Sequence, residues 1–226
     1  MAIIVAIDGF SSCGKSTIAK QLAKYAGYTY VDTGAMYRAL ALFCLRNNLI
    51  SDTEVNESAL LEQISELNIS FKIQADGTQH IMLNNEDVES EIRSLEVANA
   101  ASRVSTIPFV RKELVRQQQL MGKRKGIVMD GRDIGTVVFV NAELKLFLTA
   151  SPEIRAQRRY DELLAKGENI DFDAVLANVK ERDYRDTNRT ESPLRKASDA
   201  IEIDNSALTR EEQIERIISI FDQHNK

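Results

Sequence analysis

Cysteine and proline are both scarce in this chain of 226 residues. The two cysteines, Cys13 and Cys44, are too few for a disulfide framework, and no spacing of Cys and His resembles a zinc site. The three prolines mark no linker, and the sequence contains no repeat and no low-complexity segment. The sequence therefore indicates neither disulfides nor a structural metal, and domain boundaries must be inferred from changes in hydrophobic pattern.

Long apolar runs are lacking as well. No run approaches the roughly 20 residues that span a bilayer, and the opening MAIIVAIDG has neither the basic flank nor the cleavage site of a signal peptide. We therefore expect a cytoplasmic protein that does not bind membranes. The net charge of 29 − 34 = −5 makes a generally basic surface for nucleic acid unexpected. No segment marks a dimer face, so we expect a monomer.

What is present is typical of an α/β domain, with 43% apolar and 28% charged residues. Short apolar runs alternate with helical patterns, which predicts a mostly parallel sheet between layers of helices. Thr209 and Glu212 have capping-box spacing at the start of a last helix, whose apolar face is Ile214, Ile217, Ile218 and Phe221. The runs expected to form strands are residues 3–7, 126–130, 144–150 and 200–204.

The middle of the chain has a different period. Ile69, Phe71 and Ile73 alternate with polar residues, Asp76-Gly77 supplies a hairpin turn, and apolar alternation resumes after it. This predicts a small antiparallel ribbon inserted in a parallel fold. From the spacing alone, the insert is either a decorative excursion or a lobe that binds substrate.

The segment GFSSCGKS, residues 9–16, satisfies the pattern G-x-x-x-x-G-K-[ST] and lies between a strand and a helix, as a phosphate-binding loop requires. Its backbone N–H groups and the helix N-terminus attract phosphates, Lys15 reaches the terminal phosphates, and Ser16 can ligate Mg²⁺. We interpret Cys13 as a small structural residue of this loop. The residues expected to bind ATP are Gly9, Ser11, Ser12, Cys13, Gly14, Lys15, Ser16 and Thr17.

Three classes of protein use such a loop. A GTPase switch needs Asn-Lys-x-Asp, and the only Asn-Lys pair is Asn225-Lys226 at the end of the sequence. A motor or transport ATPase needs coupling domains for which 226 residues leave little room. A small-molecule kinase needs a second pocket in which arginines surround an acceptor phosphate. The rest of the sequence favours this third class.

Three downstream segments supply candidate residues for that second pocket. VDTGAMYR (31–38) joins a strand to a helix that carries Arg38, although a solvated arginine at a common junction is the simpler interpretation. VMDGRDIGTVV (128–138) ends a strand at Asp130, which is well placed for the Mg²⁺ shell, although it also fits a plain Asp-Gly turn. KERDYRDTNR (180–189) places Arg182, Asp186 and Arg189 on one helical face, either as a solvated charge run or as a phosphate clamp.

In this order, these segments resemble the bacterial cytidylate kinases of the nucleoside monophosphate kinase group, over essentially the whole chain. The most specific pieces are DTGAMYR, EIRSLEVANAASRVSTIPFVR, DGRDIGTVVF and KERDYRDTNR. Phe10 stands where many members have Pro, and Thr33 where many have Ser; both changes keep the local role plausible. The resemblance implies a core of residues 1–36, 112–152 and 190–226, a monophosphate-binding lobe of residues 37–111 and a mobile helical lid of residues 153–189.

The resemblance also implies roles for individual residues. Those matching Arg38, Arg132 and Arg189 surround the acceptor phosphate, and those matching Ser102, Arg111 and Asp133 read the cytosine. Those matching Arg182 and Asp186 hold the ribose, and Thr33 belongs to the same CMP site. In the lid, Arg158 or Arg159 would close over the transferring group. The residues expected to be catalytic are Lys15, Arg132, Arg158 and Arg189, with Ser16 and Asp130 at the metal.

The expected reaction is phosphoryl transfer from ATP, with Mg²⁺, to CMP or dCMP. The acceptor phosphate is already ionised at neutral pH, so no general base is needed, and His80 and His224 are expected at the surface. In-line positioning and positive charge are sufficient for this chemistry. A related monophosphate or metabolite kinase and a nucleotide-dependent switch remain the alternatives.

Overall fold

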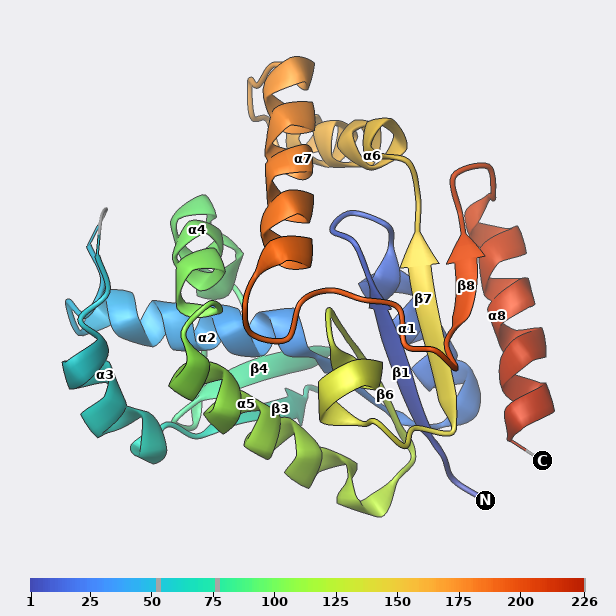
Figure 1. Ribbon diagram of the computed structural model, residues 1–226, viewed down its shortest axis with the longest axis horizontal. Helices are drawn as coiled ribbons and strands as arrows, with labels where there is room; N and C mark the ends of the chain where they lie inside the picture. The colour runs from blue at the N-terminus through green and yellow to red at the C-terminus, as the bar shows by residue number, and fades with distance from the viewer. Residues whose placement is uncertain (52–53, 76–77, 226) are drawn as a thin grey trace. The chain divides into compact units, whose positions relative to one another are not determined.

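The structure is a computed structural model that describes residues 1–51, 54–75 and 78–225 (Figure 1). The chain divides into two compact units. The first consists of Met1–Val31 and Arg124–Lys226, and the second is Asp32–Lys123.

A five-stranded sheet of order β2-β6-β1-β7-β8 forms the centre of the first unit. β1 pairs in parallel with β6 and β7, and β7 pairs in parallel with β8. The apolar runs therefore form the mostly parallel sheet that the sequence predicts. Val5, Ala6 and Ile7 are completely buried, as expected for a central strand that is covered on both faces. The strands are β1 (Ile4–Gly9), β2 (Thr29–Asp32), β6 (Ile127–Gly131), β7 (Leu144–Thr149) and β8 (Ile201–Asp204).

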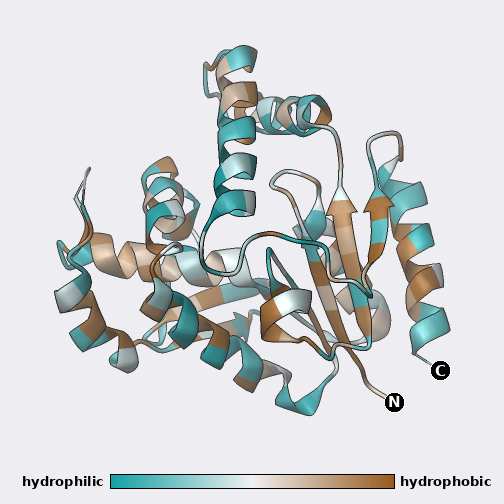
Figure 2. Cartoon of the chain, in the orientation of Figure 1, coloured by the Kyte–Doolittle hydropathy of each residue, from teal (hydrophilic) through white to brown (hydrophobic). Residues whose placement is uncertain are grey.

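Helices α1 (Lys15–Ala26) and α8 (Arg210–His224) pack against this sheet, as Figure 1 shows. The α8 capping box between Thr209 and Glu212 is present as predicted. Of the predicted apolar face of α8, Ile217 and Phe221 are buried in the core that α1 and the strands share. Figure 2 shows β1 and β7 in the brown of apolar residues, in agreement with their position in this core.

Helices α6 (Pro152–Ala165) and α7 (Phe172–Asn188) lie beyond the carboxyl end of β7 in Figure 1. They bury a separate small cluster of Ala156, Leu163, Val175 and Val179, with Tyr160 edge-on against Phe172. Figure 2 shows hydrophilic turns alongside apolar ones in both helices. The first unit also contains the π-helix η4 (Ile134–Val138), and the short η3 (Gly122–Arg124) lies at the boundary of the two units.

The second unit contains a three-stranded antiparallel sheet of order β3-β4-β5. Ile69 faces Leu83 and Phe71 faces Ile81 across β3 and β4, which confirms the expected ribbon. Its turn at Asp76-Gly77 lies outside the described residues. The elements are α2 (Thr33–Arg46), α3 (Glu57–Gln63), η1 (Ile64–Glu66), β3 (Ile69–Ile73), β4 (Gln79–Leu83), β5 (Glu86–Asp87), η2 (Glu91–Arg93), α4 (Leu95–Val104) and α5 (Pro108–Met121).

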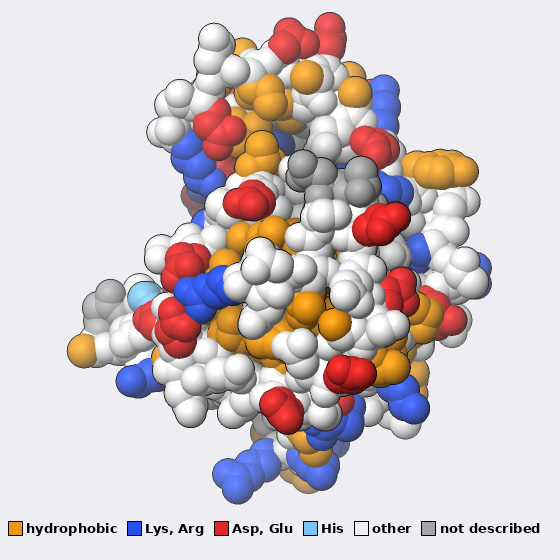
Figure 3. All heavy atoms as spheres, turned by 90° about the vertical axis from the view of Figure 1, so that its left-hand side faces the viewer, with side chains coloured by type: hydrophobic (Ala, Val, Ile, Leu, Met, Phe, Trp, Pro, Cys, Tyr) orange, Lys and Arg blue, Asp and Glu red, His pale blue; other side chains and the backbone are white. Residues whose placement is uncertain are grey.

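Burial in the ribbon is uneven. Ile81 is fully buried and Ile69 nearly so, whereas Ile73 at the end of β3 is 70% exposed. On the face shown in Figure 3, acidic and basic side chains are interspersed among apolar ones. Both cysteines are free and buried. In the described part of the chain, no helix has the length and apolar character needed to cross a bilayer.

Candidate active site

The phosphate-binding loop follows β1 without an intervening residue. Gly9 ends β1 with φ +146°, and a Cβ on this glycine would lie 2.0 Å from the carbonyl oxygen of Leu148 on β7. Ser12 and Gly14 adopt positive φ angles of 58° and 80°, and α1 begins at Lys15. Left-handed residues before a helix turn successive N–H groups inward, which makes a concave site for anions. The predicted strand, loop and helix are therefore present at the predicted positions.

Lys15 lies inside this loop and is only 6% exposed. Its Nζ donates to the Phe10 carbonyl oxygen at 2.5 Å, and the Cys13 thiol donates to the same oxygen at 2.8 Å. Burial lowers the pKa of Lys15, because the ammonium ion has lost most of its contact with water. Cys13 therefore has a structural hydrogen bond in the loop, and the buried Lys15 ammonium is placed among the loop's backbone groups.

The two residues predicted at the metal are joined directly. The Ser16 hydroxyl donates to Asp130 Oδ2 at 3.0 Å, and the Tyr30 hydroxyl donates to Asp130 Oδ1 at 2.8 Å. A hydroxyl and a carboxylate are hard oxygen donors of the kind that Mg²⁺ prefers, so this pair fits a magnesium ion. The described residues contain no group of three or more His, Cys, Asp or Glu that could hold a metal. A hydroxyl, a carboxylate and the nucleotide's own phosphates are the usual set of Mg²⁺ ligands in such sites.

Asp8 is a buried residue that sequence reasoning missed. Its carboxylate accepts hydrogen bonds of 2.7 Å from the backbone N–H groups of Ile134 and Gly135, at the start of η4. Burial raises the pKa of Asp8 to about 6, although these two hydrogen bonds oppose the shift. The Asp8 carboxylate thus holds the loop that carries Arg132 and Asp133. One signal was available in the sequence, namely a carboxylate within an otherwise apolar strand.

Arg132, Asp186 and Arg189 are brought together in the first unit, with Asp133. Arg132 Nε donates to Asp186 Oδ2 at 2.7 Å, and Arg189 Nη2 lies 3.7 Å from Asp133 Oδ1. Helix α7 ends at Asn188, so the expectation that Arg189 continues the helical face is wrong by one residue. Arg189 is the C-cap residue, with extended backbone angles, and its guanidinium also donates to the Ser192 carbonyl oxygen at 2.8 Å.

The charges around this group are predominantly positive. Burial lowers the pKa of Arg182 to about 10, and the neighbouring cations Arg132, Arg159 and Arg185 lower it further, while Asp186 opposes them. Burial raises the pKa of Asp186, but the charge and hydrogen bond of Arg132, together with the charges of Arg189 and Arg182, outweigh burial and lower that pKa. A place where several guanidiniums repel one another is suited to a ligand with two negative charges, such as a monophosphate.

Thr33 and Arg38 lie on α2 in the second unit. Asp32 caps this helix by accepting from the Ala35 N–H at 2.9 Å, and Arg38 Nη2 pairs with the same carboxylate at 3.0 Å. Arg93, which sequence reasoning missed, also lies 3.8 Å from Asp32. Thr33, the first residue of the helix, is buried. The cap therefore holds the Arg38 side chain in place.

Ser102 and Arg111 belong to α4 and α5 of the second unit. Arg111 is 4% exposed, its Nη1 donates to the Ser105 carbonyl oxygen at 3.0 Å, and its guanidinium lies 5.7 Å from the centre of the Tyr37 ring. The predicted residues thus form two groups. Lys15, Ser16, Asp130, Arg132, Asp133, Arg182, Asp186 and Arg189 belong to the first unit, and Thr33, Arg38, Ser102 and Arg111 belong to the second.

The arginine side chains of α6 bind other residues of the first unit. Arg158 donates to the side-chain and backbone oxygens of Asn205, both at 2.9 Å, and Arg159 pairs with Glu162 at 3.0 Å. Arg155 was not predicted, yet it is 2% exposed, pairs with Asp183 through both terminal nitrogens at 2.8 and 2.5 Å, and lies 4.9 Å from the Phe10 ring centre. Its sequence context, an amphipathic helix with several arginines, gave no signal of this burial.

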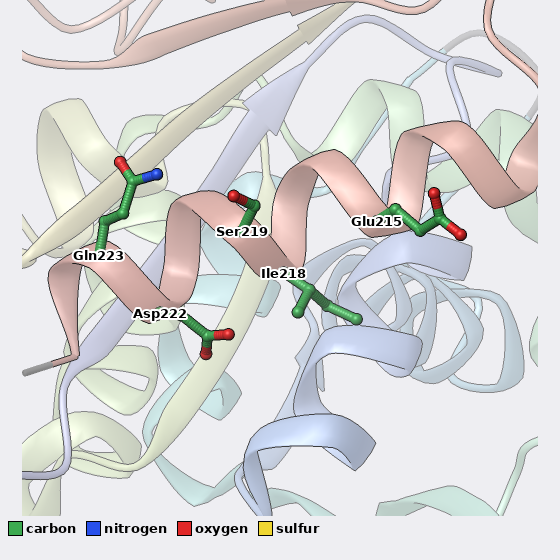
Figure 4. Close-up of a pocket in the computed structure, with 5 residues that line it drawn as sticks. All are labelled: Glu215, Ile218, Ser219, Asp222 and Gln223. Carbon is green, nitrogen blue, oxygen red and sulfur yellow. The ribbon is translucent and has the colours of Figure 1, made fainter.

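Other polar features lie outside these groups. His224 is exposed, and His80 is partly exposed and pairs with Asp87 at 2.7 Å. Figure 4 shows the residues that line a pocket on α8, and all of them come from that one helix. They are Glu215, Ile218, Ser219, Asp222 and Gln223. None of them belongs to the predicted site.

The sequence matches known proteins over nearly its whole length. The family model for cytidylate kinase matches residues 5–223. Cytidylate kinase of Flavobacterium johnsoniae is 57% identical over 219 residues, which cover 96% of this chain and 95% of that protein. Cytidylate kinase of Parabacteroides distasonis is 58% identical over 212 residues, 93% of each chain. Cytidylate kinase of Porphyromonas gingivalis is 52% identical over 223 residues, 98% of this chain and 96% of that protein. The chain therefore belongs to the cytidylate kinase family.

Proposed function

We propose that the protein transfers the γ-phosphoryl group of ATP to CMP or dCMP, giving ADP and CDP or dCDP. It thus acts as a nucleoside monophosphate kinase in pyrimidine metabolism. One observation carries the proposal most directly: a phosphate-binding loop and a cluster of buried or half-buried arginines belong to the same compact unit. Membership of the cytidylate kinase family supports the choice of acceptor.

In this proposal the loop residues Gly9 and Ser11 to Thr17 bind the phosphates of ATP. Ser16 and Asp130 hold Mg²⁺, whose charge, when the ion is bound, offsets that of the β- and γ-phosphate oxygens. The hydrogen bond between the two side chains supports this assignment, because it brings both oxygen donors to one place. Lys15, within the same loop, supplies a further positive charge to the phosphates.

The acceptor nucleotide is assigned to the remaining residues. Arg38, Arg132 and Arg189 bind its phosphate, and Arg182 and Asp186 bind its ribose. The base is read by Ser102, Arg111 and Asp133, with Thr33 in the same site. The low pKa of Asp186 supports its role, because a carboxylate that stays ionised can accept hydrogen bonds from ribose hydroxyls.

The chemistry needs no proton acceptor, because the attacking oxygen of a monophosphate is already ionised. What the residues supply is orientation and positive charge around oxygens whose charge redistributes during transfer. Arginine suits this task, since its planar guanidinium binds two oxygens at once and stays charged. Lys15, Arg132 and Arg189 are the best supported catalytic groups. Arg158 is less well supported, because Asn205 occupies both of its terminal nitrogens.

The proposed domain organisation is a core, a monophosphate-binding lobe of residues 37–111 and a lid of residues 153–189. The separate apolar cluster between α6 and α7 supports the lid, because a segment that closes over a site must keep its own packing while it moves. The scarcity of cysteine favours a cytoplasmic protein. We assign a monomer because no segment of the sequence marks a dimer face.

A coupled assay of ADP release tests the function. We expect rapid ATP consumption with CMP and dCMP, and much slower consumption with AMP and GMP. Equal rates with all monophosphates would contradict the base assignment. A nucleotide-dependent switch would bind ATP and transfer nothing to any acceptor, so the same panel also tests that alternative.

A further inference from the structure

The side chain of Asn205 connects the phosphate-binding loop to helix α6. Asn205 follows β8 directly, is completely buried, and donates its backbone N–H to the Thr149 carbonyl oxygen of β7 at 2.9 Å. Its Nδ2 donates to the Cys13 carbonyl oxygen of the loop at 2.8 Å. Its Oδ1 and its backbone oxygen each accept from Arg158 at 2.9 Å.

These contacts define the orientation of the Asn205 amide. Arg158 can only donate, so the oxygen of the amide must face it, and the Cys13 carbonyl can only accept, so the NH₂ group must face the loop. A rotated amide would place like groups against each other at both ends. Because the backbone of Asn205 continues the pairing of β7 with β8, the side chain is anchored to the sheet as well.

The contact with Cys13 has a consequence for the next peptide group. In a planar trans peptide, the C=O and the following N–H point in opposite directions. A hydrogen bond that holds the Cys13 carbonyl toward Asn205 therefore turns the N–H of Gly14 the opposite way. Gly14 has φ +80° and is the N-cap residue of α1, so its N–H stands at the positive end of the helix, where an anion is attracted.

We propose that Asn205 is a positioning residue for ATP: it orients the Gly14 N–H toward the phosphates, and Arg158 holds Asn205 in the required rotamer. This inference rests on the proposed function only in assuming that the loop binds ATP. In this proposal the two terminal nitrogens of Arg158 bind Asn205 and not the transferring phosphoryl group. The geometry of the phosphate-binding loop then depends on α6, which carries Arg158. Neither the sequence pattern of the phosphate-binding loop nor the residues assigned to CMP predict a role for residue 205.

The test compares three variants in calorimetric titrations with MgATP alone and with CMP alone. Asn205→Ala removes the donor to the Cys13 carbonyl. We expect the Kd for MgATP to rise by about threefold to tenfold, because this corresponds to the loss of one neutral hydrogen bond. Asn205→Asp keeps the volume and both acceptors for Arg158 but places an oxygen against the Cys13 carbonyl. It should raise the Kd for MgATP at least as much. The Kd for CMP should stay at the wild-type value in both variants.

Ser206→Ala is the matched control, because Ser206 Oγ accepts from the Ser151 N–H at 3.0 Å and so joins the end of β8 to α6 without contacting the loop. A merely structural role for Asn205 would lower the melting temperature, the result that we expect for Ser206→Ala, and would leave the Kd for MgATP unchanged. That result in the folded Asn205→Asp variant would overturn the inference. A wild-type protein that binds MgATP but does not phosphorylate CMP would overturn the proposed function instead, and the titrations would still test Asn205.

Discussion

Arg132 and Asp186 form a hydrogen-bonded ion pair of 2.7 Å that joins the loop after β6 to helix α7, across 54 residues of sequence. The pair is about one-fifth exposed on both sides. Asp186 binds the Arg132 guanidinium at its Nε. The two terminal nitrogens of a guanidinium can bind a second anion through two parallel hydrogen bonds. The same carboxylate lies near Arg182, and its negative charge partly opposes the lowering of the Arg182 pKa by burial. Asp186 thus organises two of the arginines that we assign to CMP.

Replacing Arg132 or Arg189 with alanine is expected to lower kcat by roughly 10³-fold, because each removes positive charge from the transferring group. Arg132→Lys should recover little of this loss, since lysine cannot bind two oxygens in the plane of a fork. The measurement is steady-state kinetics with CMP, together with a thermal melt to confirm folding.

Arg116→Ala is the control for these variants. Arg116 is exposed on α5 and pairs with Glu113, three residues before it in the same helix. It should change kcat by less than about twofold, as expected for a surface ion pair. Wild-type turnover in both Arg132→Ala and Arg189→Ala would refute the phosphate clamp.

Asp8 predicts a pH dependence of stability. Its pKa in the folded protein is about 6, above the ordinary aspartate value of 3.8, so folding favours the protonated form. The stability that this residue contributes is fully present below pH 4 and is lost as the pH rises through 6. By linkage, a shift of this size changes the free energy of unfolding by on the order of 2 to 3 kcal/mol. Asp8→Asn removes this titration, so the stability of the wild type relative to Asp8→Asn should fall between pH 4 and pH 7.

Urea denaturation at several pH values measures this difference directly. Asp204→Asn is the control, because hydrogen bonds from Ser206 lower the pKa of the exposed Asp204 carboxylate, which gives its titration the opposite sign. If wild type and Asp8→Asn show parallel pH profiles, Asp8 does not titrate in this range and its assigned pKa is wrong.

Gly9→Ala should prevent stable folding of the loop. The new Cβ would lie 2.0 Å from the Leu148 carbonyl oxygen, a backbone atom of the central sheet, and the φ of +146° is unfavourable for alanine. We expect a loss of 3 kcal/mol or more in the free energy of unfolding, measured by urea denaturation.

Gly167→Ala separates the two causes of that loss. Gly167 has φ +81° with no atom within 4 Å of its Cβ position, so it carries the backbone cost without the clash. This variant should lose only about 1 kcal/mol. Similar losses in the two variants would show that the contact with Leu148 is not what requires glycine at position 9.

The order of strands and helices, the phosphate-binding loop and the capping of α8 were all determined by local sequence. Each depends on residues within a few positions of one another, such as Gly9 to Ser16 or Thr209 and Glu212. These features can therefore be predicted from the sequence without knowledge of the fold. The acceptor arginines were found by resemblance to a family, because a charge run such as residues 180–189 has the same appearance on a solvated helix.

Tertiary structure alone decided the partners of the buried polar groups. Asp8 serves as a cap for η4 because β1 and β6 are neighbours in the sheet, and Arg155 is buried because Asp183 comes to it from α7. Asn205 has a role only because the end of β8 meets both Cys13 and Arg158. A polar residue enters a core when partners distant in sequence compensate for its lost hydration, and that compensation depends on the folded arrangement.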